Sequence, residues 1–382
     1  MKRWLTKPLG EICELVNGAP FKPSDWDGTG LPIIRIQNLN DSAKPFNYTS
    51  KILPEKFRVR PGDTLLSWSG TPGTSFGCFR WNGPEGWLNQ HIFNCYLRKE
   101  VLPSFFINQV NSKLDELIGK AHGGVGLQHI TKGALSSVMV TFPPLAEQGR
   151  IVKLLDAADE LRKLRAQADT RTAALLPALF NEMFGDPIKN TKKWPQDLFA
   201  NVGKLDRGRS KNRPRDEPSL YGGKYPFIQT GDVANSNGQI TSHTQTYSER
   251  GLAQSRMWPA QTLVITIAAN IGKTAILTFP ACFPDSMVGF IPGEKVLVDY
   301  VRQWLVTMES RLEEAAPQMA QKNINLRILS ELTIPVPPLP LQKEFAQRVT
   351  EIRELEAAQS ASRQRLEALF QSMLHRAFNG EL

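Results

Sequence analysis

Two hydrophobic patterns alternate along the chain, and each occurs twice. The first consists of short apolar runs, rich in branched and aromatic residues and bounded by Gly, Pro and Asn, which predict β-strands. These runs are LPIIRI, DTLLSW and HIFNCYL in the first half, and YPFIQT, TLVITIA and SMVGFI in the second. Helical spacing of apolar residues at 104–120 and 298–316 predicts a helix beside each group of strands. The first pattern therefore predicts two mixed α/β globules.

The second pattern is a long helical stretch after each group of strands. It follows Pro-Pro-Leu at 143–145 and again at 337–339, and it runs to Pro177 in the first copy and to Gly380 in the second. Because proline disfavours helix in the residue before it, the helices should begin at 146–147 and 341–342. Steps of four and three connect Leu154, Ala158, Leu161, Arg165, Ala168, Thr172, Leu175 and Leu179, and then Ile352, Leu355, Gln359, Ser362, Leu366, Leu369 and Met373. This spacing predicts a coiled-coil seam with small or polar residues at its middle.

Identical residues also recur at a constant offset of 194. The pairs are Pro32/Pro226, Leu135/Leu329, Pro143/Pro337, Pro144/Pro338, Leu145/Leu339, Gln148/Gln342 and Phe184/Phe378. Two copies of one architecture follow from this repeat. The predicted boundaries are 1–145 for the first globular domain, 146–186 for the first long helix, 187–339 for the second domain and 340–382 for the second long helix.

The two long helices are expected to pack on each other, because each seam needs a partner. The chain must return after the second domain, so the pair should be antiparallel. A helix of about 35–40 residues is about 55 Å long, so the coil would act as a rigid spacer and not merely dock the domains. Pro177 should bend or break the first helix, since an interior proline costs about 3 kcal/mol. The predicted fold class is mixed α/β, with two α/β domains separated by two long helices in an antiparallel coiled coil and an internal two-fold repeat.

The charge balance narrows the class of partner. The 382 residues include 46 Lys and Arg against 37 Asp and Glu, a formal charge of +9. This surplus favours a polyanionic partner, although it also fits a merely basic soluble protein. The four cysteines lie far apart without a histidine at zinc-ligand spacing, which predicts reduced core thiols. No apolar run has the length of a signal peptide or of a membrane span, so a cytoplasmic protein is expected.

The sequence lacks the motifs of the common enzyme classes. The GKT at 272–274 is not preceded by the glycine that a phosphate-binding loop requires, and GGVGLQ at 123–128 lacks the spacing of a dinucleotide-binding turn. There is no HExxH, no GxSxG and no N/D-P-P-Y/F motif of amino-methylating enzymes, and the five histidines are scattered. These observations predict a binding protein with no catalytic residue, no metal site and no cofactor of its own.

The repeated PPL-x-x-Q helix carries a family resemblance. Two further motifs contribute to it: FGDP at 184–187 after the first helix and FNGEL at 378–382 at the end of the second. Over essentially its whole length the chain resembles the specificity subunit of a type I restriction-modification system. The resemblance implies two target recognition domains, each reading one half of a split double-stranded DNA sequence, and helices that set the spacing and carry two methyltransferase subunits. It also implies that S-adenosylmethionine, ATP and Mg act in partner subunits, among them restriction-translocation subunits.

Base edges and phosphates are recognised by amide, hydroxyl and cationic side chains, so polar loops after strands are the candidate DNA contacts. In the first domain these are Arg35, Gln37, Ser67, Trp68, Ser69, Thr71, Gln90, His91, Gln128, His129 and Lys132. In the second domain they are Gln229, Thr230, Thr266, Asn270, Lys273, Asp285, Ser286, Gln321, Lys322, Asn323 and Asn325. For each one, a solvated turn is the alternative. Trp68 could stack on a base or be buried, and the basic stretch 205–215 fits a phosphate clamp or a mobile loop.

The outward faces of the long helices hold more apolar residues than a water-facing surface normally keeps, which predicts a partner surface. Its residues are Val152, Leu155, Leu164, Leu176, Phe180, Phe184, Phe345, Val349, Phe370, Leu374 and Phe378. The main rival function is a protein-interaction scaffold that presents two binding domains on a coiled-coil rod. A salt-dependent DNA affinity would separate the two functions, because a scaffold makes no phosphate contacts. A mimic that occupies the methyltransferase without reading DNA should be acidic, whereas this chain is basic.

Overall fold

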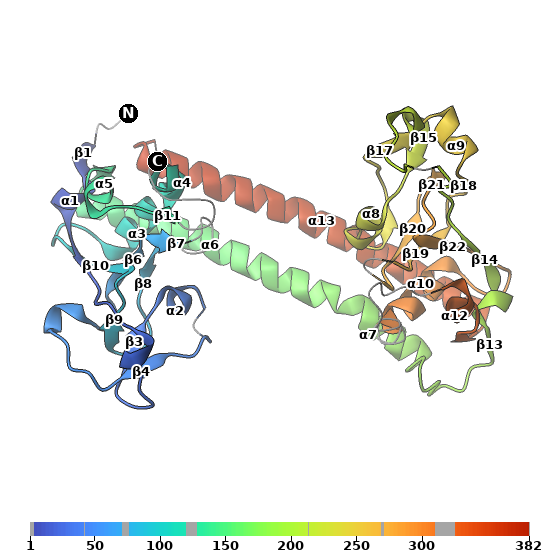
Figure 1. Cartoon of the computed structure of the whole chain (residues 1–382), viewed down its shortest axis with the longest axis horizontal. Helices are drawn as coiled ribbons and strands as arrows, with labels where there is room; N and C mark the ends of the chain where they lie inside the picture. Colours follow the sequence, from blue (N-terminus) through green and yellow to red (C-terminus); the bar gives the residue numbers. More distant parts are fainter. Residues whose placement is uncertain are drawn as a thin grey trace. The chain divides into compact units, whose positions relative to one another are not determined.

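The computed structural model describes residues 4–41, 43–70, 76–119, 128–212, 214–268, 271–309 and 325–381. The chain forms two compact units, one of Met1–Ala166 with Ala361–Leu382 and the other of Gln167–Ser360. Because this division cuts both long helices, each unit contains one globular part and a section of each helix (Figure 1).

The first globular part contains two four-stranded sheets. Its strands are β1 (Leu5–Pro8), β2 (Cys13–Asn17), β3 (Leu31–Ile34), β4 (Asn47–Thr49), β5 (Arg58–Val59), β6 (Thr64–Ser67), β7 (Ser69–Gly70), β8 (Gly77–Arg80), β9 (Gly86–Leu88), β10 (Ile92–Leu97), β11 (Gln128–His129) and β12 (Met139–Phe142). One sheet has the order β2-β10-β6-β8 and is antiparallel, and the other has the order β4-β3-β9-β5 with β3 and β9 parallel. The pairs β1–β12 and β7–β11 complete the part.

Five short helices accompany these strands. They are α1 (Leu9–Ile12), α2 (Ile36–Asn40), α3 (Pro103–Ser112), α4 (Leu114–Gly119) and α5 (Lys132–Ser136). The main core lies where α3 covers the antiparallel sheet: Phe106 and Val110 from the helix join Leu66, Phe93 and Cys95 from the strands. All five side chains are buried, and burying residues of this kind is the main source of folding free energy.

The second globular part has strands at corresponding places. They are β13 (Gln196–Leu198), β14 (Gly203–Arg207), β15 (Tyr221–Phe227), β16 (Gln239–Ile240), β17 (Gln245–Tyr247), β18 (Met257–Trp258), β19 (Leu263–Thr266), β20 (Thr274–Leu277), β21 (Ala281–Cys282), β22 (Met287–Pro292) and β23 (Thr333–Pro335). The helices are α8 (Thr230–Ala234), α9 (Glu249–Ala253), α10 (Val298–Thr307) and α12 (Leu326–Ser330).

Both parts have the same strand order, which confirms the repeat predicted from the sequence. The sheet β14-β22-β19-β20 corresponds to β2-β10-β6-β8, and β17-β15-β21-β18 corresponds to β4-β3-β9-β5, including the one parallel pair. The pair β13–β23 corresponds to β1–β12. One difference stands out among the described residues: β16 adds a fifth, parallel strand to the antiparallel sheet of the second part.

The long helices are α6 (Leu145–Ala173), α7 (Leu175–Phe184) and α13 (Leu339–Phe378). In the first unit, Leu155 packs in one cluster with Phe378, and Arg162 forms an ion pair with Glu367 at 2.8 Å. In the second unit, Gln359 Nε2 donates to Thr172 Oγ1 at 2.9 Å, and the rings of Phe180 and Phe345 lie 5.6 Å apart. In these contacts the residue numbers on α6 and α7 increase while those of their partners on α13 decrease. The helices therefore form the predicted antiparallel coiled coil.

The predicted break at Pro177 is also present. Helix α6 ends at Ala173 and α7 begins at Leu175, so the break precedes the proline by one helical turn. Proline has no N–H to donate to the carbonyl four residues earlier, here that of Ala173. The Ala174 N–H instead donates to Arg171 O, three residues back, at 3.2 Å, which is the tighter turn typical of helix ends.

Five of the fifteen predicted seam positions are exposed, so the prediction is wrong for these five. The side chains of Leu154, Leu161 and Leu175 are 37%, 51% and 45% exposed, whereas Leu155 is 2% exposed. On α13, Leu355 and Leu369 are likewise exposed, at 44% and 51%. Several heptad registers can be drawn through a leucine-rich helix, and the globular parts select one of them by covering the face that contains Leu155.

The prediction of an outward face is wrong for most of its residues, for the same reason. Leu164 is exposed, at 50%, but Val349 is buried and Val152 is partly buried. Phe180, Phe184 and Phe345 are fully buried in the core of the second unit, where Tyr300 of α10 stacks against Phe180 at 5.6 Å. Leu155 and Phe378 are buried in the first unit. The remaining three residues are partly buried and pack against these same two cores: Leu176, Phe370 and Leu374.

The repeated glutamine explains why the Pro-Pro-Leu motif occurs twice. Gln148 Oε1 accepts from Leu102 N–H at 2.8 Å, while its Nε2 donates to Glu100 O and Pro143 O at 2.9 and 2.8 Å. Gln342 makes the matching three bonds, to Leu297 N–H, Lys295 O and Pro337 O, at 2.8, 3.0 and 2.8 Å. Both side chains are 0% exposed. Each glutamine therefore ties the start of a long helix to the loop that begins α3 or α10.

The four cysteines are free and buried, as predicted for reduced core thiols. Burial is the largest cause that raises the pKa of the Cys78 thiol far above its ordinary value, which keeps it protonated. Across the described segments, no helix is long and apolar enough to cross a membrane. Within the same segments, no three His, Cys, Asp or Glu side chains are grouped so that they could hold a metal ion.

Candidate nucleic-acid interface

In the first unit, several predicted contacts meet at the end of β6. Trp68 N–H donates to His91 O at 3.4 Å, and Ile130 N–H donates to Trp68 O at 3.1 Å. Strand β7 pairs with β11, placing Ser69 opposite His129 and Gly70 opposite Gln128. The backbone thus brings three separate candidate loops to one edge of the fold. Of the side chains of Gln128 and His129 nothing is described, and Thr71 lies outside the described residues.

Trp68 is held by its neighbours on three sides. Its indole Nε1 donates to Asn17 Oδ1 at 3.1 Å, and its ring stacks on Phe93 and tilts against His91, with both centroid distances at 5.6 Å. The side chain is half-buried and packs against the main core of the first part. It is therefore a fixed aromatic platform at the edge, and not a mobile wedge. Asn17, which orients it, was missed from the sequence because it lies 51 residues away.

A second group lies at the ends of the parallel strands. Residues Ile34 and Leu88 are paired in register, so Arg35 and Gln90 follow them at the same edge. Arg35 Nη1 donates to Asn47 Oδ1 at 3.0 Å, and its guanidinium lies 5.4 Å from the Trp26 ring. Both contacts fix the direction of the arginine while leaving it half-buried.

The second unit repeats this arrangement with different side chains. Gln229 stands 194 residues after Arg35, and both backbone N–H groups donate to the side chain three residues on: Asn38 Oδ1 at 3.1 Å and Asp232 Oδ2 at 2.7 Å. The Gln229 amide donates to Gln245 Oε1 at 2.5 Å. The cap is therefore the same in both units, while the side chain at this position differs.

Asp285 follows β21, the counterpart of β9, and it is neutralised by arginine. Both of its carboxylate oxygens accept from Arg215 Nη2, at 2.7 and 2.9 Å, and its carbonyl accepts from Arg207 Nε at 2.5 Å. The basic stretch 205–215 is therefore partly ordered against this loop. A bare carboxylate would repel phosphate, whereas this pair leaves the edge without excess negative charge.

The remaining predicted residues have mixed placements. Gln37 and Lys132 are exposed, and Thr230 and Ser286 are half-buried. Lys273 forms an ion pair with Glu309, which neutralises much of its positive charge within the fold. Asn270, Gln321, Lys322 and Asn323 lie outside the described residues.

Three predicted contacts are corrected by their burial. Ser67, Ser69 and Thr266 are 2%, 4% and 0% exposed, because they close buried strands and their side chains are directed into the fold. Thr266 Oγ1 donates to Lys273 O at 3.2 Å across the turn. These hydroxyls stabilise the ends of β6 and β19 and are not available at the surface.

Asn325 has a structural task that the sequence interpretation overlooked. Its Oδ1 accepts from Ile328 N–H at 2.9 Å and caps α12. Thr131, 194 residues earlier, caps α5 in the same way by accepting from Ala134 N–H at 3.2 Å. Asn and Thr are common N-cap residues, because the side-chain oxygen can accept from the backbone N–H three residues later. This signal was therefore present in the sequence.

Comparisons with known proteins agree with this architecture. The family model of the type I restriction modification DNA specificity domain matches residues 1–169 and again 199–368. The chain is 22% identical over 429 aligned positions to the EcoBI specificity subunit of Escherichia coli, covering 99% of this chain and 86% of that protein. It is 22% identical over 406 positions to the putative MjaX specificity subunit of Methanocaldococcus jannaschii, covering 99% and 93%.

Solved structures show the same fold. A chain from a type I restriction-modification system, whose structure concerns complex assembly and conformational transition, matches with a TM-score of 0.67 and 20% identity, covering 100% of this chain and 99% of that one. The S subunit of a type I system from M. genitalium matches with a TM-score of 0.58 and 15% identity, covering 98% and 96%. Since the family model accounts for both halves, this chain belongs to the type I restriction-modification DNA specificity family, whose relatives are specificity subunits.

Proposed function

We propose that each globular part reads one half of a bipartite double-stranded DNA target. In this proposal, 1–145 and 187–339 are the target recognition domains, and 146–186 and 340–382 are the spacer helices. The observation that carries the proposal is the repetition of one strand order in two units that both match the specificity-domain model. Two readers held at a fixed distance select half-sites separated by a fixed gap, so the helices would set the length of the unread spacer.

The proposed reading edge contains amide, aromatic, hydroxyl, carboxylate and cationic groups at matching strand ends. In the first domain these are Arg35, Gln37, Trp68, Gln90, His91 and Lys132. In the second domain they are Gln229, Thr230, Lys273, Asp285 and Ser286. Amide side chains suit adenine and guanidinium or ammonium groups suit guanine, each contributing about 1–3 kcal/mol of discrimination. Gln128, His129, Thr71, Asn270 and 321–323 belong to the loops beside these residues and stay within the proposal.

Apart from Leu164, the helices offer a different surface for partner subunits than the one predicted from the sequence. Leu161, Leu164 and Leu369 are 51%, 50% and 51% exposed in the first unit, and Leu175 and Leu355 are 45% and 44% exposed in the second. Exposed leucines in this number are unusual on a helix that faces water. We infer that they help to dock two methyltransferase subunits, which would bring S-adenosylmethionine and methylate the bound DNA.

The chain itself is proposed to be non-catalytic. ATP and Mg would act in restriction-translocation subunits, if the complex includes them, and this chain would supply sequence specificity alone. Its surplus of nine positive charges supports contact with a polyanion. The described histidines and acidic residues form no metal-binding group, so the proposal needs no cofactor within this chain.

A genome-wide map of N6-methyladenine tests the proposal. Cells that express the chain with its co-encoded methyltransferase are compared with cells that lack the chain. The expected result is a split motif with a fixed gap that disappears in the deletion strain. Replacing 1–145 with the same segment of a relative should change one half of the motif only. A change in both halves, or no lost motif with an active methyltransferase, would refute the proposal.

A further inference from the structure

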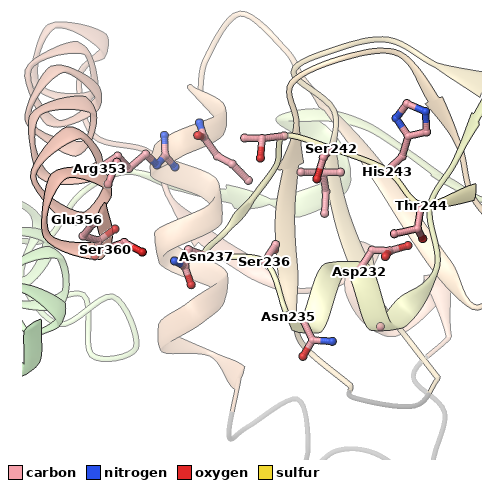
Figure 2. Close-up of a pocket in the computed structure, with 15 residues that line it drawn as sticks. Asp232, Asn235, Ser236, Asn237, Ser242, His243, Thr244, Arg353, Glu356 and Ser360 are labelled. Carbon is pink, nitrogen blue, oxygen red and sulfur yellow. The ribbon is translucent and has the colours of Figure 1, made fainter. Parts of the chain in front are cut away.

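The second unit contains a polar pocket that the proposed DNA-reading edge does not use. Its volume is 520 Å³, within the range of ordinary ligand sites. One wall is the face of α13 that contains Arg353, Glu356 and Ser360, and the other wall is the segment 235–244 between α8 and β17 (Figure 2). All lining residues belong to the second unit.

The wall opposite α13 includes a sheet edge. Strand β16 is the last strand of its five-stranded sheet, and Gln239, Ile240 and Thr241 line the pocket. Gly238, just before this strand, packs on the half-buried Arg302: a Cβ at this glycine would lie 2.0 Å from the Arg302 guanidinium carbon. An edge strand can accept an additional extended segment through backbone hydrogen bonds.

Two arginines beside the pocket are incompletely satisfied. Arg353 Nη1 donates to Asp299 Oδ1 at 2.8 Å, but within the described residues its buried Nη2 and the buried Nε of Arg302 have no acceptor. Burial, and then the charge of Arg353, lower the pKa of the nearby Arg302 to about 10, whereas the negative charge of Glu356, on the same face of α13, acts to raise it. An unpaired buried donor is costly, so a bound acceptor would stabilise the site.

The chemistry of the lining limits what can bind. Asp232 and Glu356 outnumber the one lining arginine, which is already paired with Asp299, so a phosphate would meet net negative charge. Among the described residues that line the pocket there is no Phe, Tyr or Trp, whereas unpaired nucleobases are usually held by aromatic stacking. The hydroxyl and amide side chains of the segment 235–244, with Ser360 on α13, suit a backbone that offers donors and acceptors in turn.

Among the described residues of the first unit, the charges at the positions equivalent to Arg353 and Glu356 differ. Positions 194 residues before Arg353 and Glu356 hold Asp159 and Arg162, so the charges are reversed. Arg162 is committed to Asp159 at 3.3 Å, to Glu367 at 2.8 Å and to the Phe370 ring at 4.3 Å. The added strand β16 occurs only in the second of the two described antiparallel sheets. The pocket therefore breaks the two-fold repeat.

We propose that this pocket binds, once per chain, an extended polypeptide segment that carries a lysine or arginine and belongs to another subunit of the complex. The segment would lie along β16, accept from Arg353 through a backbone carbonyl and place its cation against Glu356. The identity of the donor subunit rests on the proposed function. Because the site occurs in only one half of a repeated chain, the two halves of the complex would differ in this contact.

The test uses short overlapping peptides that cover the co-encoded methyltransferase and restriction subunits, probed with the purified full-length chain. The strongest peptide is then titrated in solution by fluorescence anisotropy. Glu356→Gln and the pocket-filling Asn237→Trp should each weaken binding about tenfold or more, as should replacing the peptide's basic residue with alanine. Glu351→Gln, on an exposed part of the same helix, is the matched control and should leave binding unchanged.

Several results would overturn the inference. The inference fails if no peptide binds, if Asn237→Trp leaves the affinity unchanged, or if Glu351→Gln weakens binding as much as Glu356→Gln. It also fails if an oligonucleotide, and not the peptide, protects the pocket residues from hydrogen exchange. Thermal melting of each variant shows that it is folded.

The methylation motif of cells that express each variant separates the two proposals. A retained motif without peptide binding refutes this inference alone, whereas a lost motif with peptide binding kept refutes the proposed function.

Discussion

The glutamine of each Pro-Pro-Leu motif gives the sharpest test of how the helices are anchored. Replacing Gln342 by Leu keeps the side chain's approximate size but removes the partner of one N–H group and of two carbonyl groups, all at a position that is 0% exposed. A buried polar group left without a partner costs about 1–3 kcal/mol. Since the carbonyls can find water more easily than the Leu297 N–H, the total expected loss is about 3–6 kcal/mol.

This loss should appear in the second unit and not in the first. For a unit of this size, 1 kcal/mol corresponds to about 2–4 °C in Tm, so its unfolding transition should fall by about 6–24 °C. Hydrogen exchange resolved by residue measures the local effect: the amide of Leu297 should lose protection, while Leu102, bonded to Gln148, should keep it. The Gln148→Leu variant should show the reverse pattern.

Gln347 provides the matched control, because it is an exposed glutamine on the same helix. The Gln347→Leu variant should change the free energy of unfolding by less than about 0.5 kcal/mol. If Gln342→Leu were no more destabilising than this control, or if protection were lost equally at Leu102 and Leu297, the anchoring role derived from the hydrogen bonds would be refuted.

Four further variants test separate parts of the structure. Phe180→Ala should cost about 3–5 kcal/mol in urea unfolding, because the ring is 1% exposed among aromatic neighbours; a cost below about 1 kcal/mol would contradict its core position. Leu161→Ser should leave stability within about 0.5 kcal/mol but weaken co-purification of the methyltransferase, and unchanged co-purification would count against docking there. Lys132→Met should reduce the slope of log affinity for DNA against log salt by about 1 if its ammonium contacts a phosphate, and an unaltered slope would exclude that contact. Asn325→Ala should cost about 1 kcal/mol with the methylation motif retained, as expected of a helix cap, whereas an altered second half-site would show that the residue reads bases.

The repeat and the helices could be predicted because they depend on the spacing of residues along the sequence. The offset of 194 is visible in pairs such as Gln148 and Gln342, and the sequence alone showed that two such segments must return on each other. The break near Pro177 follows from the covalent structure of proline, which acts wherever the residue stands. Fold class could therefore be predicted without knowledge of any long-range contact.

The candidate site was predicted less evenly. In the first unit the backbone brings three of the predicted loops together at the end of β6, while a DNA-facing edge shared by both units stays a prediction. The direction of individual side chains was not: Ser67 and Thr266 are buried, and Asp285 is paired with Arg215, 70 residues away. A polar residue in a turn has the same appearance in the sequence whether it caps a helix, closes a strand or faces solvent.

By itself, the sequence determined that this protein has two copies of one α/β architecture, that two long helices follow them, and that those helices run antiparallel. Tertiary structure alone decided which helix face is buried, since Leu155 and not Leu154 lies against the globular part. It also decided that Gln148 and Gln342 anchor the helices and that β16 builds a pocket in one half. Periodicity and proline act on neighbouring residues, so they can be read locally, whereas burial and hydrogen-bond partners depend on segments that only the folded chain brings together.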